Sequence, residues 1–400
     1  MTSPIYGSPL PVTDKGLLDQ IEKDSIQYFI RLSDKMTGLT RDSSRTGAPA
    51  SIAATGFSLA ALAIGQSRGW VDQELAYSQL KKTLQTLTTR AAHKNGFFYH
   101  FLDARTGERV WNSEASSIDT ALLAAGALLA AQYYPGTDIE RMARKIYERI
   151  NWPWMTNRSH LVCMGWNPES GFLPYYWDSY SEHLILQALA IGSPTYPLPK
   201  SSWQEWNRNE ETYLGKKIVY SFTGSLFTYQ YAQAFIDFKN LDDRGVNYFE
   251  NSKQAAIANR EYSLSSKNFK GYSPPSWGLS ASLGPGGYRA YGAKPGQGLQ
   301  DGTIAPYAAI ASIVFTPEES LRAIRFFYKK HGALLYGNFG FKDAFNLDKN
   351  WWSAEYLGID QGVTVLMLEN FSNNGMVWNK FMRLEAIKKW IRVCELAKNQ

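Results

Sequence analysis

Six stretches of the chain are apolar on nearly every side, and more polar, one-sided stretches separate most of them. The apolar stretches begin near Ser51, Ala115, Ser181, Ser225, Gly302 and Gly358. The one-sided stretches cover residues 14–32, 71–92, 137–150, 250–262, 317–331 and 379–396. A helix that is apolar all round belongs in an interior, whereas a one-sided helix covers a surface. We therefore predict an all-α protein, an (α/α)6 toroid, whose loops at one end form a concave rim.

The helical pattern also predicts a single domain. A length of 400 residues would permit more than one domain, but no Gly/Ser-rich or Pro-rich linker interrupts the pattern. We place the domain at residues 15–396 and expect residues 1–14 to form an extended segment on the surface. This Pro/Ser-rich start resembles the stretch that follows a removed export signal, so we expect the protein to be periplasmic or secreted. We also expect it to be a monomer.

Charge and composition exclude several classes of function. The net charge of +6 comes from scattered Lys and Arg residues, whereas nucleic-acid binding needs a basic stripe. No apolar run is long enough for a membrane span. The five histidines show no paired ligand spacing, so we expect no metal and no other cofactor. The glycine-rich run at 283–298 lacks the Gly-Lys-Ser/Thr ending of a phosphate loop and is interpreted as a flexible rim loop.

Four long connections precede inner helices, at residues 97–111, 161–177, 268–301 and 336–357. The first two resemble β-hairpins. Because inner helices of an alternating ring run parallel, all four connections should lie at one end, where long loops usually carry function. Aromatic residues are frequent in these connections, and such flat rings suit the faces of sugars, although we expect about half of them to pack against the ring. They are Trp111, Trp152, Trp154, Trp166, Tyr175, Tyr176, Trp177, Trp277, Trp351 and Trp352.

Acidic residues gather at the starts of the inner helices, namely Glu114, Asp119, Asp178, Glu182, Asp301, Asp343 and Asp360. The simplest role for an acid or serine there is a helix N-cap, which fits Ser113, Asp178 and Asp301. Glu182 and Asp360 fit that role poorly, because each lies within an apolar stretch. Ionisable groups forced into a cavity wall usually have a catalytic or pairing role. Two carboxyl groups across a sugar-lined cavity are the minimum equipment for glycoside hydrolysis.

Seven blocks of sequence resemble the glycoamylase-like (α/α)6 family. This family includes the bacterial endo-β-1,2-glucanases of glycoside hydrolase family 144, and a related domain occurs in cyclic β-1,2-glucan synthases. The resemblance spans roughly residues 15 to 395. The blocks are YYWDSYSEHLILQALAIGSPTYPLP (175–199), SLFTYQYAQAFIDF (225–238), NYFENSKQAAIANREY (247–262), GYSPPSWGLSASLGPGGYRAYG (271–292), DGTIAPYAAIASIVFTPEESLRAIRFFY (301–328), GFKDAFN (340–346) and GIDQGVTVLMLENF (358–371).

The resemblance implies cleavage inside β-1,2-glucan chains, with inversion and release of sophoro-oligosaccharides. It assigns the general acid to Glu182 of WDSYSE and the base side to Asp360 of GIDQG, with Asp343 of GFKDAFN as the competing choice. In this group the base can act through a substrate hydroxyl. We expect substrate-binding side chains at Glu114, Asp119, Trp177, Asp178, Tyr180, Trp277, Tyr288, Trp351 and Gln361.

The chain departs from the family's usual wording at two places. It has Tyr229-Gln230-Tyr231-Ala232-Gln233 where many relatives have an HQYSH-like block, and Val363-Thr364 where many have Pro-Ile. The first change is expected to affect a subsite. Three other functions therefore stay open: transglycosylation of β-1,2-glucan, a β-glucosidase acting on chain ends, and a glycan-binding protein without activity.

Overall fold

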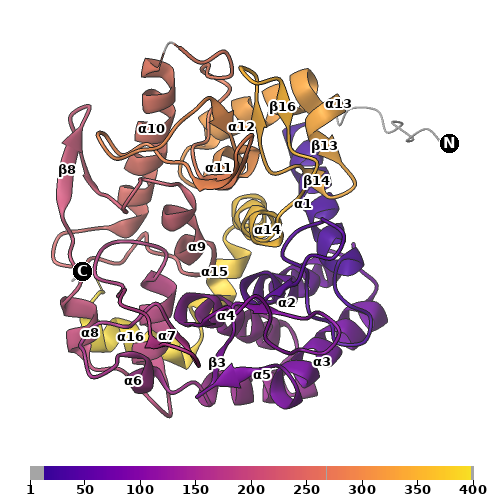
Figure 1. Ribbon diagram of the computed structural model, residues 1–400, viewed down its shortest axis with the longest axis vertical. Helices are drawn as coiled ribbons and strands as arrows, with labels where there is room; N and C mark the ends of the chain where they lie inside the picture. The colour runs from indigo at the N-terminus through magenta and orange to yellow at the C-terminus, as the bar shows by residue number, and fades with distance from the viewer. Residues whose placement is uncertain (1–12, 267, 398–400) are drawn as a thin grey trace.

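The computed structural model describes residues 13–266 and 268–397. Its helices form an inner ring that is surrounded by outer helices (Figure 1). The inner helices are α2 (Ile52–Ser67), α4 (Ser117–Tyr133), α7 (Leu184–Gly192), α9 (Phe227–Phe235), α11 (Pro306–Ile310) and α14 (Gly358–Ser372). The helices outside them are α1 (Asp14–Arg31), α3 (Gln73–Thr89), α5 (Asp138–Glu148), α10 (Tyr248–Ser265), α12 (Pro317–Phe326) and α16 (Glu385–Cys394). The remaining pieces are α6 (Trp152–Met155), α8 (Lys200–Gln204), the π-helical turn Phe327–His331, α13 (Gly332–Leu335) and α15 (Met376–Phe381).

The inner helices contact one another in sequence order, which confirms the predicted helical ring. Helix α2 packs on α4, α4 on α7, α7 on α9, α11 on α14, and α14 on α2. Gln230 joins α9 to α11, because its Nε2 donates to Ala308 O at 2.7 Å and to Ser312 Oγ at 3.0 Å. Nearly every residue of α2, α4, α7 and α14 is buried, as expected from their apolar sequences.

Two glycines let α2 and α4 approach closely. A Cβ added to Gly126 of α4 would lie 1.9 Å from Gly56 O of α2. A side chain at either position would therefore push the two helices apart, and neighbouring members of the ring with them.

The outer layer differs from the prediction at the C-terminal end. The single helix predicted at 379–396 is two helices, α15 and α16, and α16 packs on α7 beside the short α8 (Figure 1). Helix α8 has only five residues, so the last helix of the chain covers the inner helix that would otherwise lack a long outer partner. At Gly192 of α7 an added Cβ would lie 2.2 Å from Ala386 O, so this contact is as tight as a ring contact.

A buried ion cluster joins α1, α2 and α14 at the end of the ring where α2 finishes. Arg68 contacts Glu369 at 3.0 Å and Asp19 at 2.7 Å, and the Glu369 side chain is 1% exposed. Glu22 beside them is fully buried, and burial together with the charge of Glu369 raises the pKa of its carboxyl well above its usual value. Glu22 therefore stays protonated, while Arg68 balances the charge of Glu369.

We expect Arg68→Ala to lower the free energy of unfolding by ~3 kcal/mol, because it leaves the buried Glu369 carboxylate without its cation. Urea unfolding followed by circular dichroism measures this change. Arg322→Ala is the matched control, since Arg322 pairs with Glu318 at 3.2 Å on an exposed helix face, where such pairs contribute at most about 1 kcal/mol. Equal stabilities of the two variants would contradict the role of this cluster.

Short strands lie at the end of the ring where the inner helices begin. In chain order they are β1 (Ala50–Ser51), β2 (His93–Lys94), β3 (Phe97–Phe98), β4 (Phe101–Leu102), β5 (Ala115–Ser116), β6 (Gly165–Asn167), β7 (Gly171–Phe172), β8 (Glu210–Tyr213), β9 (Lys216–Val219), β10 (Ala281–Gly284), β11 (Gly287–Ala290), β12 (Thr303–Ile304), β13 (Tyr336–Gly337), β14 (Gly340–Phe341), β15 (Phe345–Asn346) and β16 (Trp351–Trp352). Strands β5, β6 and β7 form one antiparallel sheet, and β12, β15 and β16 form another.

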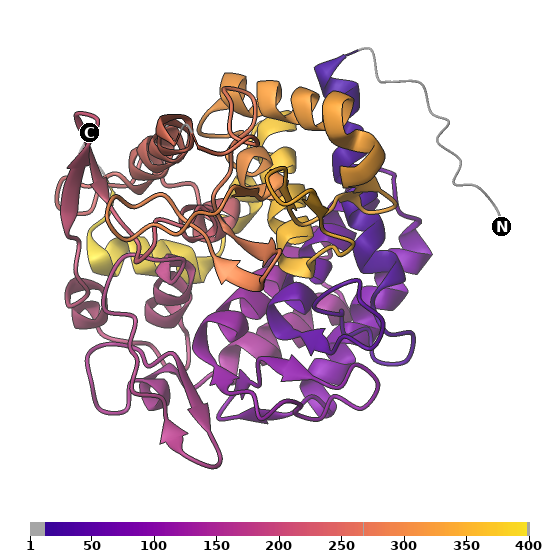
Figure 2. The same ribbon diagram turned by 45° about the horizontal axis from the view of Figure 1, so that its top comes forward.

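The hairpin predicted at 161–177 is confirmed as β6–β7. In the hairpin predicted at 97–111, the two sides of the turn are joined by a single antiparallel bridge between Leu102 and Arg109. The interpretation of 283–298 as a flexible loop is wrong for its first part. Strands β10 and β11 form an antiparallel hairpin in which Leu283 pairs with Tyr288. Figure 2 shows this hairpin in orange near the middle of the molecule.

Among the described residues, no helix combines the length and the hydropathy that a bilayer crossing requires. Most of the segment predicted to be extended, residues 1–12, lies outside the described residues. Helix α1 begins at Asp14 with Thr13 as its N-cap, and the domain boundaries stay a prediction.

Candidate active site

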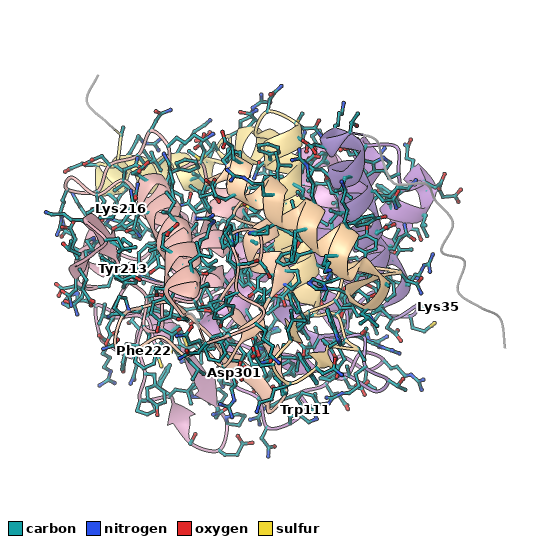
Figure 3. All side chains as sticks on the ribbon, turned by 90° about the horizontal axis from the view of Figure 1, so that it is seen from above. Lys35, Trp111, Tyr213, Lys216, Phe222 and Asp301 are labelled. Carbon is teal, nitrogen blue, oxygen red and sulfur yellow. The ribbon has the colours of Figure 1, made fainter. Side chains whose placement is uncertain are left out.

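The carboxyl groups predicted from the sequence come from the starts of three inner helices. Asp119 lies in the first turn of α4, and Asp360 lies in the first turn of α14. Glu182 lies just before α7, which begins at Leu184. The strands described above lie at the same end of the ring. Figure 3 shows this end from the side, with Phe222, Asp301 and Trp111 labelled along it.

Glu182 is a buried acid on the wall of a cavity. Its side chain is 8% exposed, and the cavity that it lines has a volume of about 220 Å³. Burial raises the pKa of the Glu182 carboxyl, and the nearby charge of Asp119 raises this pKa further. The hydroxyl of Ser181 donates to Glu182 Oε2, which opposes the shift by stabilising the charged form. A raised pKa favours the protonated form, which is the form that a general acid needs.

We expect Ser181→Ala to move the alkaline limb of the kcat–pH profile to higher pH. The variant removes a hydrogen bond to the charged form of Glu182, so the pKa of this carboxyl rises and the protonated acid persists further. The measurement is kcat across the pH range on the proposed substrate. Ser179→Ala is the control, because its hydroxyl bonds to Asp178 at 3.1 Å instead. A downward shift, or no shift, would contradict this assignment.

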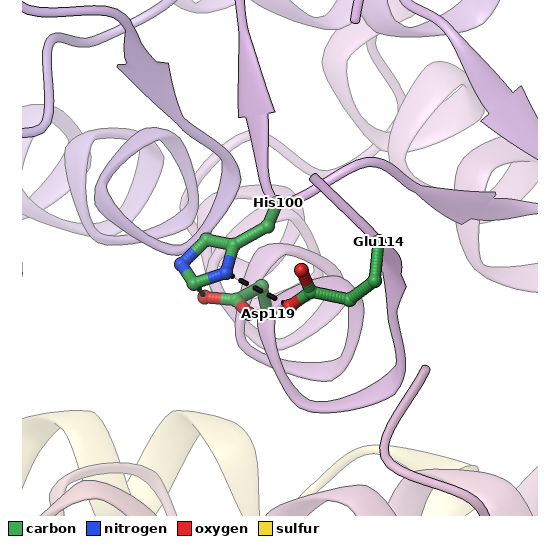
Figure 4. Close-up of side chains that lie close together, drawn as sticks. All are labelled: His100, Glu114 and Asp119. Atoms are coloured by element: carbon green, nitrogen blue, oxygen red, sulfur yellow. Dashed lines mark hydrogen bonds and ion pairs between the residues drawn. The ribbon is translucent and has the colours of Figure 1, made fainter. Parts of the chain in front are cut away.

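His100, Glu114 and Asp119 form a charged triad on α4 and the connection before it (Figure 4), and the charge of Asp119 acts on Glu182. His100 Nδ1 lies 3.0 Å from Glu114 Oε1, and His100 Nε2 lies 3.6 Å from Asp119 Oδ1. These two carboxylates, against the opposing effect of burial, raise the pKa of His100 to about 9. The residue types could hold a metal ion, and an imidazolium between the two acids offsets part of their charge. The histidine spacing in the sequence gave no indication of this triad.

Asp343 and Asp360 form a second pair of buried acids, 2% and 1% exposed. Burial raises the pKa of both carboxyls, that of Asp343 to about 6 and that of Asp360 well above its usual value. Asp343 Oδ2 accepts the backbone N–H of Leu283 at 2.6 Å, which favours the charged form. Neither oxygen of Asp360 has a fixed donor among the described residues. Two adjacent acids of this kind share one proton, and the contacts place the charge on Asp343 and the proton on Asp360.

Asp42 is a site residue that sequence reasoning missed. Its backbone oxygen accepts the N–H of Gly358 at 2.8 Å, which fixes it at the start of α14. Burial raises the pKa of the Asp42 carboxyl to about 6, while His100 opposes the shift and Asp119 adds to it. Asp42 therefore lies between the charged triad and the Asp343–Asp360 pair. In the sequence, Asp42 is an acid shortly before the first inner helix. Its neighbours are polar, so a charge there is not unexpected.

Tyr288 projects from the β10–β11 hairpin into the space between these acids. Its side chain is 55% exposed, yet burial among surrounding groups raises the pKa of its hydroxyl well above its usual value. The charges of Asp360, Asp343, Asp42 and Glu182, in that order, raise this pKa further. The expected contact of Tyr288 with substrate stays a prediction.

The other predicted residues divide into those near the site and those away from it. Trp177, Asp178 and Tyr180 line the same cavity as Glu182. Gln361 follows Asp360 and holds the β14 segment, because its Nε2 donates to Phe341 O at 2.9 Å. Trp351 is half-buried on β16. Trp277 is 0% exposed in the hydrophobic core, so its expected contact with substrate is wrong.

Three predicted N-caps are also wrong. The N-cap of α4 is Ser116, not Ser113, whose hydroxyl bonds to the backbone of Phe101. Asp178 precedes a non-helical turn, and α7 begins only at Leu184. Asp301 accepts the N–H of Thr303 at 3.0 Å ahead of β12, several residues before α11. In each case a turn or strand intervenes before the helix.

The block at residues 229–233, which differs from the family's usual sequence, mainly joins helix α9 to its neighbours in the ring. Gln230 bonds to α11 as described, and Gln233 Nε2 donates to Tyr248 O of α10 at 2.8 Å. Tyr231 is the member near the acids, since burial and the charges of Asp360 and Glu182 raise the pKa of its hydroxyl. The expected effect on a subsite stays a prediction, and the two glutamines pack the scaffold.

Comparison with known proteins gives one family. Residues 174–385, more than half of the chain, match the Glycoamylase family model, which is described as "putative glucoamylase". A curated protein of Parabacteroides distasonis, exo beta-1,2-glucooligosaccharide sophorohydrolase (non-reducing end), is 30% identical across 97% of this chain. The chain spans 59% of the length of that relative.

Solved structures of the same fold resemble the chain from end to end. A "putative glucoamylase" from Bacteroides uniformis superposes with a TM-score of 0.91 at 30% identity, over 96% of this chain and 98% of that one. The endo-beta-1,2-glucanase from Chitinophaga pinensis, in complex with sophorotriose and glucose, superposes with a TM-score of 0.89 at 26% identity, over 96% and 98%.

Proposed function

This protein belongs to the Glycoamylase family. We therefore propose that it is an (α/α)6 glycoside hydrolase that cleaves internal bonds of β-1,2-linked glucan. The observation that carries the proposal is a set of three buried acids, Glu182, Asp343 and Asp360, whose charges all act on the hydroxyl of Tyr288. Burial raises the pKa of Glu182, which favours its protonated form, and the N–H of Leu283 favours the charged form of Asp343. The similarity to β-1,2-glucan enzymes supplies the linkage.

In the proposed reaction, Glu182 donates its proton to the glycosidic oxygen as the bond from that oxygen to C1 breaks. Water attacks C1 from the opposite face and loses its proton to Asp343, directly or through a substrate hydroxyl. The product carries the inverted configuration at C1. Asp360 keeps a proton beside Asp343, and Tyr288 together with the Glu114–His100–Asp119 triad is placed to hold sugar hydroxyls.

Release of sophorose from the non-reducing end is a second candidate, favoured by the similarity to the exo-acting enzyme of Parabacteroides distasonis. The test is to incubate the protein with linear β-1,2-glucan and follow the products by chromatography from the earliest times. Internal cleavage gives oligosaccharides of mixed length at once, whereas end cleavage gives only sophorose. Products longer than the substrate would indicate transglycosylation, and no new product would contradict hydrolysis.

A further inference from the structure

Phe222 is more exposed than any other large apolar side chain in the described part of the chain, at 81%. It lies at the end of the ring that carries the acids (Figure 3). An aromatic ring left in water forgoes a large stabilisation. Isolated exposed apolar residues are common on surfaces, so further observations must decide whether this one has a role.

The loop that carries Phe222 is held on both sides. The N–H of Ser221 donates to the Tyr229 hydroxyl at 2.9 Å, and the N–H of Lys294 donates to Thr223 O at 3.0 Å. The backbone therefore has a fixed position while the ring projects from it. A ring presented in this way is preorganised for a ligand, because binding needs no ordering of the loop.

The ring of Phe222 forms one wall of the cavity that Glu182 lines. Tyr176, Trp177 and Phe227 contribute further aromatic walls, and serine and threonine hydroxyls lie between them. The volume of about 220 Å³ admits one sugar ring. Apolar walls with a few polar groups are typical of a small-molecule site, and they match a pyranose, which has apolar faces and a rim of hydroxyls.

Among the proposed catalytic acids, Glu182 lines this cavity, whereas Asp343 and Asp360 do not. A general acid protonates the oxygen that departs, and the opposing base acts at the sugar that keeps C1. Because the acid lines the cavity and the base does not, we assign the cavity to the departing chain.

We propose that this cavity binds the first glucosyl unit of the departing chain, and that Phe222 stacks on its face. This inference rests on the proposed function and adds the location of the leaving-group subsite. Binding energy from a sugar that takes no part in bond breaking can lower the barrier at the reacting carbon. Loss of the ring should therefore reduce the rate on sugar chains and leave a substrate without a departing sugar unaffected.

The test compares two substrates in Phe222→Ala. On linear β-1,2-glucan we expect kcat/KM to fall about tenfold, the loss that follows from removing one stacked ring. On β-sophorosyl fluoride the departing fluoride fills no sugar subsite, so kcat/KM should change less than twofold. Phe222→Tyr, which keeps the ring, should restore the rate on glucan to within about twofold of the wild type.

Tyr196→Ala is the control, because Tyr196 is an exposed aromatic residue that follows the other end of α7. It should leave both rates unchanged. An equal loss on both substrates in Phe222→Ala would place the ring on the other side of the bond and overturn the proposal, as would no loss on either. A wild-type protein inactive on both substrates would overturn the proposed function itself.

Discussion

Glu182→Gln is expected to lower kcat on linear β-1,2-glucan at least a hundredfold while the fold stays intact. General-acid help is typically worth ~10²–10⁴ in rate. The glutamine amide keeps the size of the side chain and can still bond to the Ser181 hydroxyl, but it has no acidic proton for the departing oxygen. The measurement is the release of reducing ends at saturating glucan, with the circular dichroism spectrum and melting temperature as checks on the fold.

The same variant should be far less impaired on β-sophorosyl fluoride, because fluoride leaves without protonation. This difference separates loss of an acid from a general disturbance of the site. Asp178→Asn provides a matched control, since Asp178 lines the same cavity but is exposed, and we expect a far smaller loss on glucan. A Glu182→Gln protein with near-normal kcat on glucan would exclude Glu182 as the acid.

Asp343→Asn should lower kcat on glucan by ~10²–10⁴, because it removes the charged carboxylate that accepts the proton of water. Asp360→Asn should cost much less, because asparagine retains an N–H donor where Asp360 holds its proton. The acid limb of the wild-type kcat–pH profile should lie near pH 6, where Asp343 loses its proton. Activity rises with pH through this limb, since only the ionised form of Asp343 is a base.

The two variants are assayed side by side over the full pH range. Asp360→Asn should keep the limb near pH 6, whereas the residual activity of Asp343→Asn should lack it. If Asp360→Asn were the inactive variant and Asp343→Asn kept most of its rate, the base would be Asp360, as the family resemblance first indicated.

The inner ring could be predicted from sequence because each of its helices is buried on every side. Helices such as α2 and α4 have Ala, Leu and Gly at more than half of their positions, and this composition is visible without knowledge of their partners. The position of α16 could not be predicted. Its amphipathic pattern requires a surface position but does not say which inner helix it covers, and the short α8 left the place on α7 open.

The acids were predicted where an apolar sequence made a charge unexpected, as at Glu182 and Asp360. Asp42 was missed because its neighbours in sequence are polar. His100 was missed because its place in the site depends on Glu114 and Asp119, which come from a later segment. The three N-cap errors share one cause. Other residues stand between each predicted cap and its helix, namely strands β5 and β12 in two cases and a turn after Asp178 in the third.

The most direct test of the account is the rate at which the protein cleaves linear β-1,2-, β-1,3- and β-1,4-glucan, with Glu182→Gln assayed in parallel. We predict that reducing ends appear with β-1,2-glucan alone and that the substitution lowers this rate at least a hundredfold. Preference for another linkage would contradict the proposed substrate, and equal rates for the wild-type and substituted proteins would contradict the role of Glu182.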